Sequence, residues 1–297
     1  MDKRQRNYSL RIQDNTNSSP PEFVTIRPPF TLEFEIVRNS LVSSNVCHLN
    51  LYNLSEQTRN KLSQDKYDFT TIKNRDILLR AGYGDNIQGF PIMFRGDVSR
   101  CWSHREGPDF ITSIDCMDRS YAFINAHTSQ SFKEGTSINN IVGALVGALV
   151  PFGIQPGAIS GIEGTISRGN SYSGNPIQIL NEITNGTFFI DSSLGNVLGQ
   201  NDVINELIVI NSDTGLLNTP VREQQYVNFE IIFEPRIRVG QQIRLQSKTN
   251  KLLSGDYVVV SVAHKGMISD AICGTAITYI GARSGSGFNQ IAPRVYS

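Results

Sequence analysis

The sequence has little of what usually marks a catalytic, metal-binding or nucleic-acid-binding protein. It contains one tryptophan and four cysteines among 297 residues, and its 27 Lys and Arg are balanced by 27 Asp and Glu. A protein that holds DNA or RNA by its phosphates normally carries excess positive charge. We therefore expect any contact with nucleic acid to be loose or local.

The cysteines have no spacing that suits a disulfide framework or a zinc site. They lie far apart, at Cys47, Cys101, Cys116 and Cys273, and none forms a C-x-x-C pair. Cysteine metal sites use closely spaced ligands. The sequence predicts four free thiols, a protein made in a reducing compartment, and no metal or cofactor.

Long apolar segments are also missing. The longest run, residues 141–152, is interrupted by Gly143 and Gly147, whereas a membrane-spanning helix needs about 20 apolar residues. Residues 1–11 are charged and polar and lack the apolar core of a secretory signal. We expect a soluble protein in which the two glycines allow close approach of helices.

Strand-like alternation dominates the first third of the chain. In residues 31–37 three apolar side chains alternate with Glu33 and Glu35, which predicts a half-buried strand. Similar patterns predict strands at 46–52, 76–83, 92–102 and 110–115. Residues 55–62 are expected to form a short helix capped by a serine. Residues 13–29, near the start of the chain, are rich in prolines and turn formers, which favours an N-terminal arm.

A helical pattern separates two strand-rich regions. Capping residues and prolines predict helices at 137–149 and 176–183. Strands resume at 227–233, 241–246, 257–264 and 271–279. The predicted fold class is mainly β with an α/β insert. The expected division is an arm at 1–28, a first β domain at 29–125, the insert at 126–210, a second β domain at 211–282 and an extension at 283–297.

The two β domains contain an internal echo. Gly96-Asp97 matches Gly255-Asp256, and His104 matches His264 at an offset that is longer by a single position. A β-bulge adds one residue to a strand and would reconcile the two offsets. The pattern favours a duplicated strand module, with the two histidines at equivalent turns.

Two stretches carry a resemblance to a known family. One is FTLEFEIVRNSLVSSNVCHLNLYNLSEQTRNKL at 30–62, and the other is VNFEIIFEPRIRVGQQIRLQSKTNKLLSGDYVVVSVAHKGMISD at 227–270. Together with the α/β region between them, they resemble the central baseplate hub proteins of contractile-tailed bacteriophages, of the tail protein D-like type. The resemblance covers most of residues 30–282.

That resemblance implies an architecture and a place in the virion. It implies two tail-tube-like β-barrels per chain and a homotrimer that forms a pseudo-hexameric ring between the tail tube and the central spike. The implied partners are other copies of the chain, the tail tube protein, the spike protein and other baseplate proteins, with DNA only passing through the lumen. The hub would assemble in the host cytoplasm, without membrane insertion. No lysozyme segment is recognisable, and no enzymatic activity is expected.

Few residues are candidates for chemistry. Glu33 and Glu35 lie about 7 Å apart by strand rise, close enough to suggest the carboxylate pair of a glycosidase. We interpret them instead as part of a strand face turned to solvent or to a neighbouring subunit. Cys101 and His104 are three residues apart on a strand and point to opposite faces, which argues against a thiol–imidazole pair. No catalytic residue is predicted.

The remaining candidates are assembly-interface or turn positions. Arg236 and Arg238 indicate a solvated basic edge or an inter-subunit salt bridge, with contact to DNA or an acidic partner as the other interpretation. The full set of such positions is Glu33, Glu35, His104, Arg236, Arg238 and His264. Sheet edges are expected to pair with neighbouring chains by strand addition. A carbohydrate- or receptor-binding module of a virion is the alternative function, although Trp102 is the only tryptophan.

Overall fold

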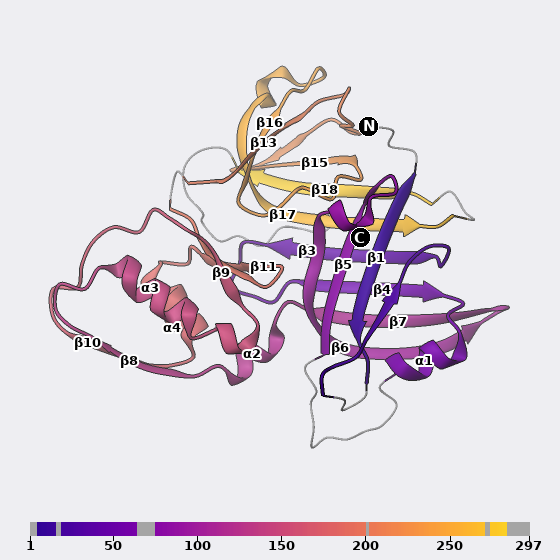
Figure 1. Ribbon diagram of the computed structural model, residues 1–297. Helices are drawn as coiled ribbons and strands as arrows, with labels where there is room; N and C mark the ends of the chain where they lie inside the picture. Colours follow the sequence, from indigo (N-terminus) through magenta and orange to yellow (C-terminus); the bar gives the residue numbers. More distant parts are fainter. Residues whose placement is uncertain (1–4, 16–18, 64–74, 200–201, 271–273, 284–297) are drawn as a thin grey trace.

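A computed structural model describes residues 5–15, 19–63, 75–199, 202–270 and 274–283. The described part is mainly β, with few helices, as predicted (Figure 1). Most of the strands belong to one large sheet of 13 strands, and an α/β lobe lies beside it. Of the extension predicted at 283–297, only Arg283 is described, as the last residue of a strand, and Cys273 also lies outside the described residues.

The strands of the first module follow the predicted alternation. Its elements are β3 (Leu32–Asn39), β4 (Val46–Tyr52), α1 (Glu56–Leu62), β5 (Arg75–Tyr83), η1 (Ile87–Gly89), β6 (Ile92–Glu106) and β7 (Asp109–Met117). In β3 every second side chain is buried, and in α1 the Ser55 hydroxyl accepts a hydrogen bond from the Thr58 amide at 3.2 Å. The predicted strands and helix are therefore confirmed here. We call β3 to β7 the first module.

The expected N-terminal arm instead forms a hairpin of the sheet. Its strands are β1 (Arg6–Gln13) and β2 (Phe23–Ile26), and β1 also pairs with β5. Tyr8, Leu10 and Ile12 share one face of β1 and are buried. This apolar alternation forms a strand, although the residues that follow it in the sequence are turn formers. The short β2 lies at the sheet edge, where strands flanked by prolines are tolerated.

The α/β lobe, which we call the insert, has its own core. Its elements are α2 (Ser120–Asn125), β8 (Thr128–Phe132), α3 (Ile138–Gly147), η2 (Val150–Phe152), β9 (Gln155–Ile159), β10 (Asn170–Gly174), α4 (Pro176–Ile183), β11 (Phe188–Asp191) and β12 (Leu194–Val197). Both predicted helices are present. Ser137 and Asn175 cap them, each accepting a hydrogen bond from a backbone amide two or three residues on. The apolar faces of α3 and α4 pack over β11 and β12.

The second module completes the sheet. Its strands are β14 (Val221–Glu223), β15 (Tyr226–Ile232), β16 (Gln241–Leu245), β17 (Gly255–Ile268) and β18 (Ala276–Arg283), with η3 (Lys251–Leu253) before β17. A further strand, β13 (Ile204–Ile210), pairs in parallel with β16. Although β13 falls within the region expected to be insert, it therefore lies in the large sheet.

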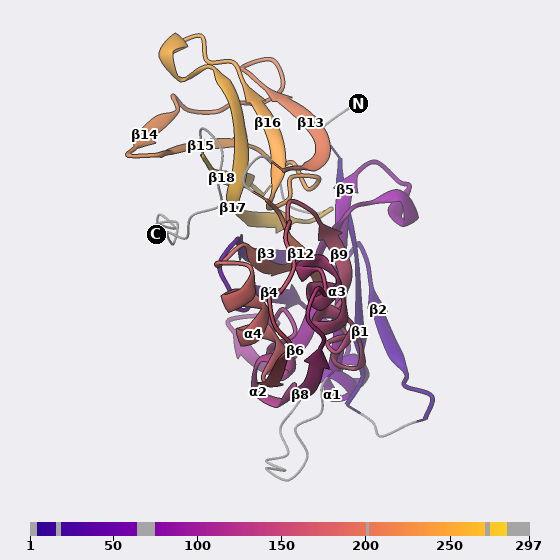
Figure 2. The ribbon, with the colours of Figure 1, turned by 90° about the vertical axis from the view of Figure 1, so that its left-hand side faces the viewer.

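The two modules are joined edge to edge by strand pairing. The sheet order is β14-β15-β18-β17-β3-β4-β7-β6-β5-β1-β2, and the β17–β3 pair connects the modules (Figures 1 and 2). Each module has a separate hydrophobic core. The pairings among the described residues form an open path, because the terminal strands β14 and β2 do not pair with each other. No closed barrel is formed by these pairings.

The two modules have the same strand order. The order β3-β4-β7-β6-β5 in the first corresponds to β14-β15-β18-β17-β16 in the second. Both long hairpins also have a bulge at the same place, between Val98 and Arg100 and between Val259 and Ser261. Alignment of the two bulges pairs Val98 with Val259. The structural equivalence is therefore shifted by two positions from the Gly-Asp match of the sequence echo, and by one position from its histidine match.

Two glycines show where an added methyl group would be harmful and where it would help. A Cβ at Gly96 would overlap the carbonyl group of Met117, which lies on the neighbouring strand. A Cβ at Gly143 meets nothing within 4 Å, because both glycines of α3 face outward instead of allowing close helix approach. The expectation of close helix contact at these glycines was wrong.

We expect Gly96→Ala to destabilise the protein by about 1–3 kcal/mol through this overlap. Gly143→Ala is the matched control and should stabilise it by about 0.5–1 kcal/mol, since it lowers the backbone entropy lost in the helix. Urea denaturation of both variants measures the difference. Equal effects of the two substitutions would contradict the packing at Gly96.

Candidate assembly surfaces and the buried junction

One face of the sheet carries the charged side chains of the central strands. The opposite face packs on the two cores, so polar residues alternate outward along β3, β4, β7 and β17. On this outer face Glu35 pairs with Lys265 at 3.3 Å, and His48 pairs with Asp115 at 2.7 Å. We call it the open face. These exposed contacts contribute little to stability, so their side chains can also contact other molecules.

Glu33 and Glu35 do not form a catalytic pair. Glu33 accepts hydrogen bonds from Asn50 at 3.3 Å and from the Tyr52 hydroxyl at 3.2 Å, while Glu35 faces Lys265. Burial and the nearby Glu33 carboxylate raise the pKa of Tyr52, which keeps the phenol protonated as a donor. Both carboxylates thus have separate structural partners, and their role at an interface stays a prediction.

The two candidate histidines occupy different environments. His104 lies near the end of β6 and is exposed, whereas His264 lies inside β17 and is fully buried. In the alignment set by the two bulges, His104 corresponds to Lys265 and His264 corresponds to Ser103. The expected equivalence at turns was wrong, because it shifted one strand by a single position and so exchanged its two faces.

The remaining sequence candidates occupy different environments. Cys101 is buried while His104 is exposed, as expected for opposite faces of β6. Arg236 forms a two-pronged ion pair with Glu234, at 2.8 and 2.9 Å, and the backbone amide of Arg238 donates to Gln241. Both arginines follow β15 in the segment that leads to β16. Their role at an interface stays a prediction.

A largely apolar groove of about 310 Å³ lies on the second module. It is lined by small or short side chains on β17 and β18, including Ser261, Ala263 and Gly281, and by Asn218, Thr219 and Val221. Among the described residues no cluster of three or more potential metal ligands is found. None of the helices in the described part has the length and apolar character needed to cross a bilayer.

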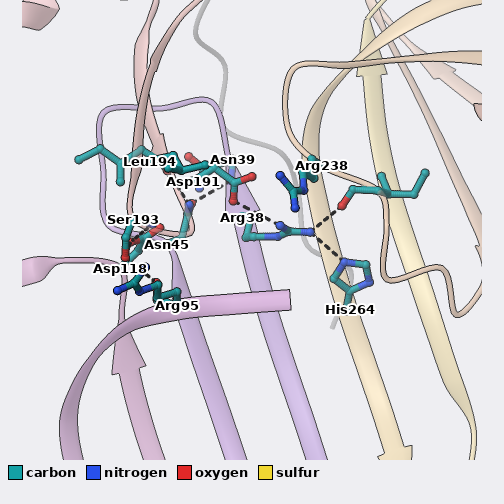
Figure 3. A network of polar contacts seen from close by, with 12 residues as sticks. Arg38, Asn39, Asn45, Arg95, Asp118, Asp191, Ser193, Leu194, Arg238 and His264 are labelled. Atoms are coloured by element: carbon teal, nitrogen blue, oxygen red, sulfur yellow. Dashed lines mark hydrogen bonds and ion pairs between the residues drawn. The ribbon is translucent and has the colours of Figure 1, made fainter. Parts of the chain in front are cut away.

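A buried arginine joins both modules to the insert. Arg38 in β3 is 1% exposed, and its guanidinium donates to Asp191 at 3.3 Å, to the Ile237 carbonyl at 2.7 Å and to His264 at 3.0 Å (Figure 3). Since a guanidinium only donates, His264 Nε2 must accept, and Nδ1 carries the proton toward Thr278. Burial, together with the charge of Arg38, lowers the pKa of His264 well below its usual value.

The insert reaches this junction with the tip of its β11–β12 hairpin. Ser192 and Ser193 form the turn with positive φ values of 53° and 65°, typical of a tight hairpin. The Ser193 amide donates to Asp118 at 2.9 Å, and Asn45 donates to the Ile190 carbonyl at 2.8 Å. We call residues 191–194 the hairpin tip. These two bonds hold the backbone of the hairpin next to Asp118 and Asn45, while the buried Ser192 hydroxyl has no hydrogen-bond partner among the described residues.

A second arginine supports the hairpin tip from the other side. Arg119 donates to Ser193 Oγ at 2.7 Å, to Asp97 at 2.8 Å and to Asp76 at 2.7 Å. Burial raises the pKa of Asp97 to about 6, outweighing the opposite effect of Arg119. Burial and then the charge of Asp191 raise the pKa of Asp118 to about 7. The junction thus holds carboxyl groups that titrate near neutral pH.

Sequence reasoning missed this junction, although one signal was present. Arg38 continues the series Leu32, Phe34 and Ile36 on the buried face of its strand. A charged residue at the next position of an apolar face indicates a buried polar contact. Its partner Asp191 lies 153 residues away in the sequence, and no local pattern indicates that pairing.

Comparison with known proteins gives a family and a set of similar folds. A family model described as baseplate hub gp41 matches residues 10–266. The fold is similar to a 43 kDa tail protein of prophage MuSo2 from Shewanella oneidensis, with a TM-score of 0.58, 8% identity, and coverage of 92% of this chain and 96% of that one. A tail protein from Neisseria meningitidis MC58 gives a TM-score of 0.59 at 8% identity, covering 93% and 96%.

A third similar structure comes from a secretion system. The E. coli c3393 protein is described as a type VI secretion component with structural similarity to the T4 bacteriophage tail proteins gp27 and gp5; it has a TM-score of 0.56 at 8% identity, covering 92% of this chain and 76% of that one. Such low identities show the fold alone. No curated protein sequence matches the chain. The family model spans most of the chain, and the chain therefore belongs to the baseplate hub gp41 family, a structural, non-enzymatic family of the phage tail baseplate.

Proposed function

We propose that the chain forms a homotrimeric, pseudo-hexameric ring that joins the tail tube to the central spike. The observation that carries this proposal is the repeated strand order of the two modules, which lie side by side in one sheet. Each module would act as one tail-tube-like β unit. Three chains then present six similar units, so a threefold hub can meet a sixfold tube.

The proposed division of the chain follows the three cores. The proposed division is a first β unit at 29–125, an insert at 126–210 and a second β unit at 211–282, and it is supported by three clusters of buried apolar residues that each draw most of their members from one of these ranges. Two adjustments are proposed. The hairpin of β1 and β2 joins the first unit in place of an arm at 1–28, and β13 joins the second unit. An extension at 283–297 stays part of the proposal.

The open face is the proposed lining of the ring. It carries Glu33, Glu35 and Asp115 against Lys265 among its central strands. Predominantly acidic walls repel phosphates, so DNA would pass without adhering. The tail tube protein, the spike protein and other baseplate proteins are the proposed partners at the two rims of the ring.

The mass of the purified full-length chain in solution tests the proposal. The chain mass is 33.0 kDa, so we expect a species of three times 33.0 kDa, that is about 99 kDa, by light scattering coupled to size-exclusion chromatography. Addition of the spike protein should shift this species to a larger complex. A stable monomer that binds glycans would contradict the hub and favour the carbohydrate-binding alternative.

A further inference from the structure

The groove on the second module is a hollow of the open face. Val37 and Ala263 line it, opposite each other on β3 and β17, and they lie two residues from Glu35 and Lys265. Alternate residues of a strand share a face, so the groove opens on the same side as that ion pair. Its volume of about 310 Å³ is near the lower end of ligand pockets, which measure about 300–1,000 Å³. It has room for a few side chains, not for a folded domain.

The equivalent place in the first module is filled. In the alignment of the two bulges, Ser261 corresponds to Arg100 and Ala263 corresponds to Trp102. The Arg100 guanidinium lies over the Trp102 ring at 4.3 Å, an arrangement in which the aromatic face attracts the cation. Gly281, which lies opposite Ser261, likewise takes the place of Asp115. At this place the second module therefore has small residues where the first module has a stacked arginine and aromatic ring.

The residues that follow β18 in the sequence carry such a pair of side chains. Residues 284–297, which lie outside the described residues, read SGSGFNQIAPRVYS. Arg294 and Tyr296 have the same spacing as the arginine and the tryptophan of β6. Arg294 is the only charged side chain of this segment, and Glu230 is the only charged residue among the described ones that line the groove. The two charges are complementary.

The segment is long enough to bring this pair to the groove. Strand β18 ends at Arg283, which lies opposite Val258 of β17, and Ala263 is five residues further along β17. Five residues of strand span roughly 17 Å. The 11 residues from 284 to 294 can span roughly 36 Å when extended. Residues 284–287 are serines and glycines, a sequence that suits a turn back along β18.

We propose that Arg294 and Tyr296 bind in this groove of their own chain, with the tyrosine ring over Ala263 and the guanidinium at Glu230. Ala263 and Glu230 lie in one row of the sheet, with Tyr279 between them, so neighbouring side chains of one segment can meet both. The bound segment would give the second module the arginine and aromatic ring that β6 provides in the first. The inference concerns a single chain and does not depend on the ring.

A pair of cysteines tests where the segment lies. In the full-length chain, Ala263→Cys and Tyr296→Cys place one thiol in the groove and one in the segment, and Cys273→Ser removes a thiol outside the described residues. The other three cysteines are buried. Under mild oxidation by glutathione disulfide we expect a bond between the two new thiols inside one chain. The linked peptides identify it in a non-reducing digest, and the protein runs as a single chain on a denaturing, non-reducing gel.

The matched control moves the groove cysteine closer to the start of the segment. Asp256 is exposed and lies two residues from Val258, so it is nearer to Arg283 than Ala263 is. A segment that is not held in the groove would reach Asp256→Cys at least as readily as Ala263→Cys. We expect Tyr296→Cys to cross-link several-fold more to the groove position than to position 256.

The reactivity of a single thiol gives a second measurement that needs no cross-link. With Ala263→Cys and Cys273→Ser present, Tyr296→Ser should make the groove thiol react several-fold faster with a maleimide, because the ring no longer covers it. Phe288→Ser changes the other aromatic residue of the segment and should leave the rate unchanged. A larger effect of Phe288→Ser than of Tyr296→Ser would overturn the assignment of the tyrosine to the groove.

The cross-linking outcomes decide the inference separately from the ring. Equal cross-linking at positions 256 and 263, or none at 263, would mean that the segment does not bind the groove, and a trimeric mass would still support the ring. A bond that joins two chains would assign the groove to the segment of a second copy and overturn the contact within one chain. Selective cross-linking inside one chain, together with protection of the groove thiol by Tyr296, supports the inference.

Discussion

Replacing Arg38 with alanine should destabilise the protein by about 3–5 kcal/mol. The guanidinium is buried and bonds Asp191, the Ile237 carbonyl and His264, so its removal leaves the Asp191 carboxylate buried without its cationic partner. The same change opens a cavity where the two modules and the insert meet. Urea denaturation, followed by circular dichroism, measures the loss.

A surface arginine provides the control for that experiment. Arg244 forms an ion pair with Asp256 at 2.7 Å, shorter than the 3.3 Å between Arg38 and Asp191, but both side chains are more than a third exposed. Arg244→Ala should therefore leave the stability close to that of the wild type. An Arg38→Ala loss as small as that of Arg244→Ala would mean that water reaches the junction and replaces the arginine.

Stability should fall as the pH rises from about 4 to about 7, and Asp118 should be a main cause. Burial and the nearby Asp191 raise the pKa of Asp118 from 3.8 to about 7. The folded state therefore binds a proton in this range that the unfolded state has released, and folding is favoured on the acid side. Since one pKa unit corresponds to about 1.4 kcal/mol, the effect is on the order of a few kcal/mol.

Asp118→Asn isolates this contribution. The amide keeps an oxygen that accepts from the Ser193 amide but cannot ionise, so the variant should gain stability over the wild type at pH 8 and little at pH 4. Asp97, with its pKa raised to about 6, adds a dependence of the same sign that persists in the variant. Buried His264 has the opposite effect on stability. Its pKa is lowered in the folded state, so at acidic pH the unfolded state binds a proton that the folded state does not, and folding is disfavoured. Denaturation midpoints across pH 4–8 provide the measurement.

Gly143→Ala is the control for the pH series. It removes no ionisable group and changes an outward-facing position of α3, so the slope of its stability between pH 5 and pH 8 should equal that of the wild type. If Asp118→Asn and the wild type show the same slope, the Asp118 carboxyl is ionised in the folded protein throughout, and the hairpin tip would then be held by a permanent anion.

Local patterns predicted most of the elements, because they depend on neighbours in the sequence. The alternation before Arg38 marked β3, and Pro176 marked the start of α4. The same approach failed where a distant partner decides the outcome. Strand β1 is stabilised by pairing with β5, which lies far along the chain. The turn formers between the two strands favoured an arm, and so this pairing was not predicted.

The candidate site shows the same limit. The echo at His104 and His264 correctly indicated two related hairpins, but only strand pairing reveals which residues correspond. Identical residue types near a turn carry no information about register, and an error of one position exchanges the buried and exposed faces. The contacts of Arg38 with Asp191 and of Arg119 with Ser193 likewise depend on how the insert folds back onto the modules.

The hairpin tip determines how mechanical load passes through the molecule. A force applied to the insert would reach the sheet through the bonds of Arg38, Asn45, Asp118 and Arg119, in parallel with the covalent links at its base. Bonds that share a load across several strands resist shear better than one connecting segment does. The insert is thus attached rigidly to the sheet. A force or torque on the insert would turn both modules together instead of bending a linker.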